Sequence, residues 1–169
     1  SDDLIRVIRD NPKITRHIHL PLQSGSTRIL KRMNRHYTKE QYLALVEKIR
    51  REIPDIAITT DLIIGFPGET KEDVEETIDV IQKVRYDNAF TFIYSKRTGT
   101  PAASYEDQVD EGQIRENFDR VLRNVQDMAK MQIARYQGQV MEALVEEMNE
   151  NDASYGTGRL SNNTLVHFP

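Results

Sequence analysis

The chain has 169 residues, enough for one domain with a single hydrophobic core, or for one domain and part of a second. Its 27 acidic and 23 basic residues give a net charge of −4, which argues against a protein that wraps nucleic acid with a strongly basic surface. The absence of cysteine excludes disulfides, thiolate metal ligands and a cysteine nucleophile within these residues. No apolar run reaches the roughly 18 residues of a membrane span, and the N-terminus does not resemble a signal peptide, so we expect no membrane association.

Strand-like and helix-like segments alternate along the first hundred residues. Residues 16–22, 56–64 and 89–94 are each predicted to form a strand, and each is followed by a polar or glycine-containing loop. Helical patterns follow these loops: Thr38 with Gln41 forms a predicted capping box, and Thr70 with Asp73 is predicted to begin another helix. Strand, loop and helix recur about every 35 residues, which favours an α/β fold with a parallel sheet over a helical bundle.

The rest of the chain changes character twice. A helix is predicted from about Gln113 to Tyr136, after which the apolar period falls from that of a helix to two. Short strands are predicted around residues 140–145, 155–160 and 164–168, the last two joined by an asparagine-rich turn. This predicts an all-β unit that begins at about residue 137 and is incomplete at residue 169.

Ligands of parallel βα folds bind at the carboxyl ends of the strands. This rule indicates the three loops at residues 23–26, 65–70 and 95–101. Their glycines either make turns or let the backbone approach a ligand, and their recurrence in all three loops favours the second interpretation. Asp61, near the end of an apolar strand, indicates a ligand-binding or supporting role, or else an inward polar residue of a partly open barrel.

Two further groups of side chains have weaker interpretations. His17 and His19 share one strand face, but no third ligand is visible nearby, so half-buried strand residues are favoured over a metal pair. Arg35, Lys96 and Arg97 follow loop or helix ends, where they could meet a carboxylate or phosphate, although lone surface cations usually do not. The sequence contains no P-loop, G-x-G-x-x-G, G-x-S-x-G or H-E-x-x-H motif.

Four motifs together resemble the radical S-adenosylmethionine methylthiotransferases. They are residues 19–26 (HLPLQSGS), 30–35 (LKRMNR), 60–70 (TDLIIGFPGET) and 92–103 (FIYSKRTGTPAA). The last motif is most similar to the MiaB type, which methylthiolates C2 of N6-isopentenyladenosine beside the tRNA anticodon. Subtypes that act on threonylcarbamoyladenosine in tRNA or on a ribosomal protein are the alternatives within the family.

The resemblance implies an architecture. Residues 1–104 would be the C-terminal part of a radical-SAM barrel, a partial TIM-type βα barrel; residues 105–136 a connecting long helix; and residues 137–169 a truncated TRAM-like β domain, which binds RNA in this family. The intact enzymes hold S-adenosyl-L-methionine and two four-iron four-sulfur clusters. The cluster cysteines belong to segments before these residues, so the resemblance implies a fragment that binds no iron and is inactive alone, with no catalytic or metal-binding residue of its own.

The resemblance to the family assigns roles to individual residues only in the cofactor pocket and at its rim. Gln23 and Ser24 match polar residues that face the ribose and methionine end of the cofactor. The family's fifth-strand motif, G-x-I-x-G-x-x-E, has Asp61 at its first glycine, matches at Ile63 and Gly65, and has Glu69 one residue late. The resemblance thus implies that the cofactor-binding residues are Gln23, Ser24, Asp61, Ile63, Gly65, Tyr94 and Ser95, and that Arg35 and Arg97 contact the substrate.

The implied function is that of a cytoplasmic, monomeric tRNA-modifying transferase. Its partners would be the anticodon stem-loop of tRNA and an electron donor such as flavodoxin or ferredoxin. A non-catalytic RNA-binding module is a second hypothesis, in which the β tail reads RNA with Tyr155, Arg159 and Phe168. A phosphate-binding barrel enzyme such as an aldolase is a third, but that class needs a catalytic Lys or Glu at a strand end, where these strands offer only Asp61.

Overall fold

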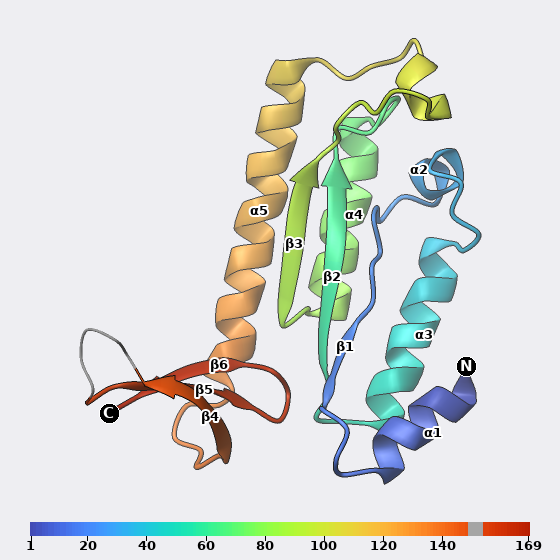
Figure 1. Cartoon of the computed structure of the whole chain (residues 1–169). Coiled ribbons are helices and arrows are strands. Elements are labelled where there is room, and N and C mark those ends of the chain that lie inside the picture. Colours follow the sequence, from blue (N-terminus) through green and yellow to red (C-terminus); the bar gives the residue numbers. More distant parts are fainter. Residues whose placement is uncertain (149–153) are drawn as a thin grey trace. The chain divides into compact units, whose positions relative to one another are not determined.

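The computed structural model describes residues 1–148 and 154–169 (Figure 1). These residues form two compact units, the first comprising Ser1–Ile18, Glu47–Ala57 and Tyr136–Pro169 and the second His19–Val46 and Ile58–Arg135. In chain order the elements are α1 (Asp2–Asp10), β1 (His17–His19), α2 (Thr27–Arg32), α3 (Lys39–Glu52), β2 (Ala57–Ile64), α4 (Lys71–Val84), β3 (Asn88–Ile93), the 3-10 helix η1 (Pro101–Ser104), α5 (Glu111–Ala134), β4 (Ala143–Met148), β5 (Gly156–Leu160) and β6 (Leu165–Phe168).

One sheet has the strand order β1-β2-β3, and its strand β3 and nearly all of β2 belong to the second unit. Strands β2 and β3 pair in parallel, in a register that runs from Thr59 opposite Asn88 to Ile64 opposite Ile93. Beyond β1, Gln23 forms a single parallel bridge with Leu62. The predicted parallel βα arrangement is therefore confirmed.

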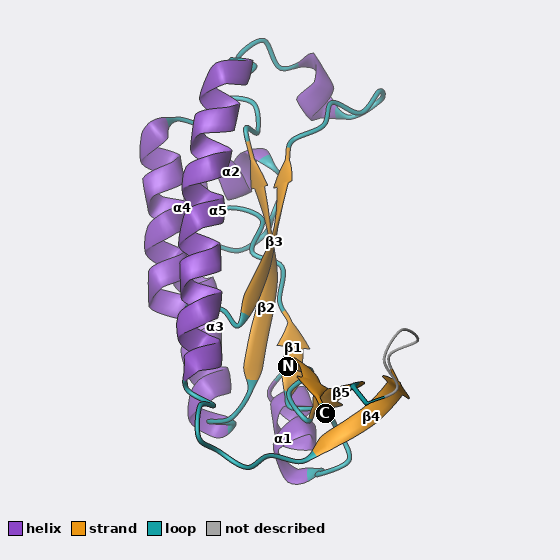
Figure 2. Cartoon of the chain, turned by 90° about the vertical axis from the view of Figure 1, so that its left-hand side faces the viewer, coloured by secondary structure: helices purple, strands orange, loops and turns teal. Residues whose placement is uncertain are grey.

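The two faces of this sheet differ in burial because strand side chains alternate. In β2, Ile58, Leu62 and Ile64 are completely buried, whereas Thr59, Asp61 and Ile63 on the other face are half-buried. Figure 2 shows α4 and α5 on one side of the sheet, and α5 packs against both α4 and β3. The buried face of β2 thus lies in the core, and the opposite face is left for other contacts.

Two helices start at the predicted caps. The Gln41 amide donates to Thr38 Oγ1 at 3.2 Å and the Thr38 amide donates to Gln41 Oε1 at 2.9 Å, which completes the predicted capping box. Thr70 and Asp73 form a second reciprocal capping box at the start of α4. Helix α5 begins two residues before the predicted Gln113, because the carboxylate of Asp110 caps it.

The first strand is shorter than predicted. Strand β1 covers only His17–His19 instead of residues 16–22. Pro21 has no amide hydrogen to donate to a neighbouring strand. Instead, the Leu22 amide donates to the buried Thr60 hydroxyl at 2.8 Å, and that hydroxyl donates to the Leu20 carbonyl at 2.8 Å. One threonine side chain therefore attaches this segment to β2.

The first unit contains a separate antiparallel sheet with the order β4-β5-β6. Strand β5 pairs antiparallel with both neighbours, and the register shifts between Val145 and Glu147 in β4. Asn163, in the turn between β5 and β6, has a φ of 67°, which asparagine tolerates better than most residues. The predicted all-β tail is thus confirmed as a three-stranded sheet. No helix in the described ranges is both long enough and apolar enough to span a membrane.

Candidate functional site

A cavity of about 940 Å³ opens at the carboxyl ends of β2 and β3, entirely within the second unit. The loop after β1, the end of α2, the ends of both strands and the segment around η1 all contribute to its lining. Seven of the nine predicted site residues line it: Gln23, Arg35, Asp61, Ile63, Tyr94, Ser95 and Arg97. Most of the predicted site residues therefore lie together in one cavity, and their role in ligand binding stays a prediction.

Gln23 is held in an uncommon conformation at the edge of this cavity. Its φ is 71°, a value that few residues other than glycine adopt, and it is only 7% exposed. Its amide donates to the Asp61 carbonyl at 2.9 Å, and its carbonyl accepts from the Ile63 amide at 2.9 Å. These two bonds to β2 maintain the strained backbone and keep the Gln23 side chain in the cavity lining.

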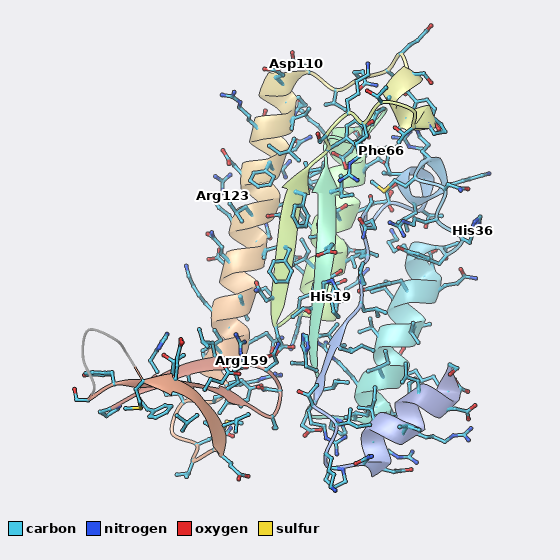
Figure 3. The ribbon with its side chains drawn as sticks, viewed as in Figure 1. His19, His36, Phe66, Asp110, Arg123 and Arg159 are labelled. Carbon is cyan, nitrogen blue, oxygen red and sulfur yellow. The ribbon has the colours of Figure 1, made fainter. Side chains whose placement is uncertain are left out.

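One wall of the cavity is aromatic and aliphatic. The rings of Phe66 and Tyr94 meet edge to face with centroids 5.2 Å apart, and Tyr105 contacts Phe66 in the same manner at 6.4 Å. Figure 3 shows Phe66 just beyond the carboxyl end of β2. The buried Tyr94 hydroxyl has no hydrogen-bond partner among the described residues. A flat ring with a polar substituent would suit this wall.

The rim of the cavity is basic. Its lining contains Lys31, Arg32, Arg35 and Arg97 and a single acidic residue, Asp61. Arg32 Nη2 pairs with Asp107 at 2.8 Å, and its guanidinium lies 4.8 Å from the centre of the Tyr105 ring. Lys31, Arg35 and Arg97 make no side-chain hydrogen bond or ion pair within the described part of the chain. An anionic ligand group would therefore find cations that are not already paired.

Asp61 also belongs to a polar cluster on the face of the sheet. His19 Nε2 lies 3.3 Å from Asp61 Oδ2, and His19 Nδ1 lies 2.9 Å from the Thr59 hydroxyl oxygen. With a proton on Nε2, the imidazole donates to the Asp61 carboxylate and accepts from Thr59. Within the described ranges no three histidine or carboxylate side chains gather to hold a metal ion, so a metal site at His17 and His19 gains no third ligand.

Two predicted residues, Ser24 and Gly65, do not line the cavity, and their place in a cofactor site stays a prediction. Ser24 is 1% exposed, and its hydroxyl accepts from the Ser26 amide at 3.2 Å, so it shapes the loop before α2. Gly65 has a φ of +80°, and a Cβ added there would lie 2.7 Å from Ile114 Cγ1 of α5. Gly65 therefore permits a tight turn against a helix.

The carboxyl group of Glu69 stabilises the turn at Gly65 by a hydrogen bond. Its Oε2 accepts from the Gly65 amide at 2.6 Å, while its buried Oε1 has no partner among the described residues. Burial raises the pKa of Glu69 from 4.5 to about 7, and the nearby Asp73 adds to this rise. Hydrogen bonding to Gly65 and the charge of Arg28 oppose it. Glu69 thus holds the loop after β2 in place and titrates near neutral pH.

Comparison with known proteins identifies the fold family. Residues 1–81 match the model of the radical SAM superfamily. A solved radical SAM enzyme, coproporphyrinogen III oxidase (HemN) from Escherichia coli, covers 99% of the chain with a TM-score of 0.63. At 15% identity, and with 48% of that enzyme covered, it supports the radical SAM fold alone.

Closer relatives resemble the chain over nearly its whole length. The tRNA-2-methylthio-N(6)-dimethylallyladenosine synthases of Lachnoclostridium phytofermentans and Acetivibrio thermocellus are each 54% identical to it over 168 residues. The synthase of Clostridioides difficile is 51% identical over the same length. These matches cover 99% of this chain but only 35–37% of the three relatives. The resemblance to the methylthiotransferases that the motifs indicated is thereby confirmed.

Several residues that line the cavity were missed by sequence reasoning, among them Phe66 and Arg32. Phe66 and Arg32 lie inside the recognised motifs, but nothing local to them indicated a role in a site. The Phe66 ring contacts the rings of Tyr94 and Tyr105, which come from two later segments. The Arg32 guanidinium donates to the Pro67 carbonyl and to Asp107, and lies over the Tyr105 ring. The only sequence signal that could have indicated these two residues is that charged and aromatic residues recur after successive strands.

Proposed function

We propose that this chain is part of a radical SAM tRNA methylthiotransferase that adds a methylthio group to C2 of N6-isopentenyladenosine beside the anticodon. The observation that carries the proposal is the 54% identity, over 168 residues, to two synthases named for a 2-methylthio-N(6)-dimethylallyladenosine product in tRNA. The basic, ring-accepting cavity at the strand ends is in keeping with that chemistry.

The cavity fits S-adenosylmethionine by the chemistry of its lining. Ile63 and Tyr94 would contact the adenine ring, and the unpartnered Tyr94 hydroxyl would find a hydrogen-bond partner there. Gln23 would bind polar atoms of the ribose and methionine portions, and the backbone at Ser95 would contact the adenine. When bound, S-adenosylmethionine supplies radical chemistry and a methyl group, while these residues position it and exclude water.

Iron–sulfur clusters have no ligands in this chain. Clusters of this kind are held by cysteine thiolates, and the sequence contains no cysteine. The two four-iron four-sulfur clusters of the proposed enzyme would therefore be bound by residues outside this chain. We accordingly assign to this chain the cofactor-facing strands, and not the cluster chemistry.

The proposed partners follow from the same assignment. The anticodon stem-loop of tRNA would approach the basic rim with Arg35 and Arg97. The sheet β4-β5-β6 would be the start of a TRAM domain that contributes to RNA binding, after the barrel portion at residues 1–104 and the connecting segment at 105–136. An electron donor such as flavodoxin or ferredoxin, a monomeric state and a cytoplasmic location complete the proposal.

A chimeric enzyme tests the function directly. In this chimera the chain replaces the matching 168 residues of the Lachnoclostridium phytofermentans synthase. We expect a bacterium that lacks its own methylthiotransferase to regain 2-methylthio-N6-isopentenyladenosine in its tRNA, measured by nucleoside mass spectrometry. Methylthiolated threonylcarbamoyladenosine or ribosomal protein would indicate one of the other subtypes. A folded, cluster-loaded chimera without any of these products would reject the proposal.

A further inference from the structure

The face of the sheet opposite α4 and α5 carries exposed aromatic rings. Phe90 and Phe92 of β3 are 50% and 52% exposed, which is unusual for phenylalanine in a strand. In the parallel register Phe90 lies beside Asp61, and Phe92 lies beside Ile63. Phe92 also lines the cavity, whereas Phe90 does not. The aromatic face therefore begins at the cavity and continues down the strand.

The two rings have different neighbours. The Phe90 ring meets the His19 imidazole edge to face, with centroids 6.1 Å apart. His19 lies over the sheet well below Phe66, as Figure 3 shows. Phe92 makes no ring contact among the described residues. Phe90 thus contacts His19, whereas Phe92 is about half exposed and has no aromatic partner in the described part of the chain.

Asp61, on the strand next to β3 and in the lining of the same cavity as Phe92, offers a hydrogen-bond acceptor. Its Oδ2 is engaged by His19, while its Oδ1 accepts no hydrogen bond from any described residue. The Asp61 side chain is 28% exposed, so this oxygen is accessible. A carboxylate oxygen can accept a hydrogen bond from an amino group of a nucleobase. A stacking ring and an amino-group acceptor consequently lie on neighbouring strands.

The charge around the cavity identifies the occupant. Lys31, Arg35 and Arg97 supply unpaired positive charge on the same cavity to which Phe92 and Asp61 belong. A ligand that presents a flat ring with an amino group together with phosphates matches all of these features. A peptide or a second copy of the chain would explain the exposed rings but not the unpaired cations.

We propose that Phe92 is the stacking platform for the target adenine of the RNA substrate, and that Asp61 accepts a hydrogen bond from the amino group of that base. His19, restrained by Phe90 and Thr59, is a positioning residue that fixes the Asp61 carboxylate. This inference rests on the proposed function, because it places the base that the enzyme modifies. It also moves Asp61 from the cofactor to the substrate side of the cavity.

Two double-mutant cycles on the chimeric enzyme test the assignment, with binding of a fluorescein-labelled anticodon stem-loop measured by anisotropy. The first cycle compares Phe92 with Phe92→Ala, using RNA with N6-isopentenyladenosine (the adenosine RNA) or an abasic site at the target position. We expect Phe92→Ala to weaken binding of the adenosine RNA about 5- to 100-fold and to leave binding of the abasic RNA nearly unchanged. Phe92→Leu, which keeps apolar bulk without a ring, should recover only part of the loss.

The second cycle compares Asp61 with Asp61→Ala, using adenosine or purine riboside, which lacks the amino group. The enzyme with Asp61 should prefer adenosine by about tenfold, and Asp61→Ala should abolish that preference. His19→Ala should reduce the preference, and His19→Gln, which retains a donor, should restore part of it. Leu4→Ala is the matched control, because Leu4 is as exposed as Phe92, at 52%, and does not line the cavity.

The two proposals fail in different ways. If the chimera methylthiolates tRNA but the effects of Phe92→Ala and of base removal are fully additive, the stacking assignment is wrong and the proposed function stands. Retention of the adenosine preference by Asp61→Ala would likewise overturn the hydrogen-bond assignment. A chimera that binds no stem-loop and modifies no tRNA would reject both the function and the inference.

Discussion

Glu69 is the side chain whose charge state depends most on the fold. It is 6% exposed, and burial raises the pKa of its carboxyl from 4.5 to about 7. The folded chain therefore binds this proton more tightly than the unfolded chain does. The resulting stabilisation is fully present below pH 4.5 and is lost as the pH rises through about 7.

Replacing Glu69 by glutamine should remove this pH dependence. Between pH 4.5 and pH 8 the free energy of unfolding of the wild-type chain should fall relative to that of Glu69→Gln, by up to about 3 kcal/mol. Urea unfolding of both proteins across this range measures the difference. Glu106→Gln is the control, because Glu106 is exposed and should leave the profile unchanged. Parallel wild-type and Glu69→Gln profiles would show that Glu69 is not protonated near neutral pH.

Gly65 illustrates how the structure changes the expectation for a loop residue. Gly65→Ala places a side chain at a φ of +80° and directs its Cβ at Ile114, so it should destabilise the fold by about 2–4 kcal/mol. Gly99→Ala, also at positive φ but with no atom within 4 Å of its added Cβ, should cost only about 1 kcal/mol. Thermal unfolding compares the two.

The Ile114 contact can be tested separately. Adding Ile114→Ala to Gly65→Ala removes the side chain that the new Cβ meets, so the two changes should cost less together than the sum of their separate effects. Fully additive losses would instead assign the whole effect of Gly65→Ala to backbone strain.

At the scale of elements, Asp73 connects the start of α4 to the loop before α2. Its carboxylate accepts from Ser26 Oγ at 2.6 Å and from the Thr70 amide at 2.8 Å, and it forms an ion pair with Arg28. Burial alone would raise the pKa of Asp73, but hydrogen bonds from Arg28, Ser26 and Thr70 outweigh it and lower the pKa below 3.8. Stability from Asp73 is therefore lost as the pH falls through this lowered value.

Asp73→Ala should destabilise the chain more than other changes in the same helix. It removes the capping box and leaves buried donors unpaired, at a cost of about 2–4 kcal/mol. Asp79→Ala is the matched control, because Asp79 is 44% exposed and pairs only with Lys83, four residues on, so its loss should cost about 0.5 kcal/mol or less. Comparable losses for the two variants, measured by chemical denaturation, would contradict this role of Asp73.

Local signals explain which elements could be predicted. The caps at Thr38 and Thr70 depend on side chains three residues away, and both were predicted from the sequence. The extent of β1 was not, because Thr60, 40 residues from Leu20 in the chain, takes over its hydrogen bonds. The lack of room for a side chain at Gly65 was not predicted either, because Ile114, in a helix distant in the sequence, fills that space. Residue types predicted the place of the cavity, and tertiary contacts decided which side chains line it.

At the scale of the whole molecule, the proposed cofactor site and the ligands of the proposed clusters would come from different residues. The cavity combines ring-accepting and cationic residues at the ends of two parallel strands. No thiolate is available anywhere in the sequence to hold a cluster beside it. A methylthiotransferase built with this chain must therefore bring its cysteines to the cavity from other residues.

Anaerobic reconstitution with iron and sulfide tests this division of roles. The chain alone should retain no stoichiometric iron or sulfide and should lack the visible absorbance of an iron–sulfur cluster. The reason is that it supplies no thiolate ligand. The chimera with the Lachnoclostridium phytofermentans synthase should retain both after the same treatment. Stoichiometric iron and sulfide on the chain alone would show that carboxylates or histidines of this fold hold a cluster. In that case the cluster ligands would have to be sought among residues of this chain such as Asp61 and His19, and not among residues outside it.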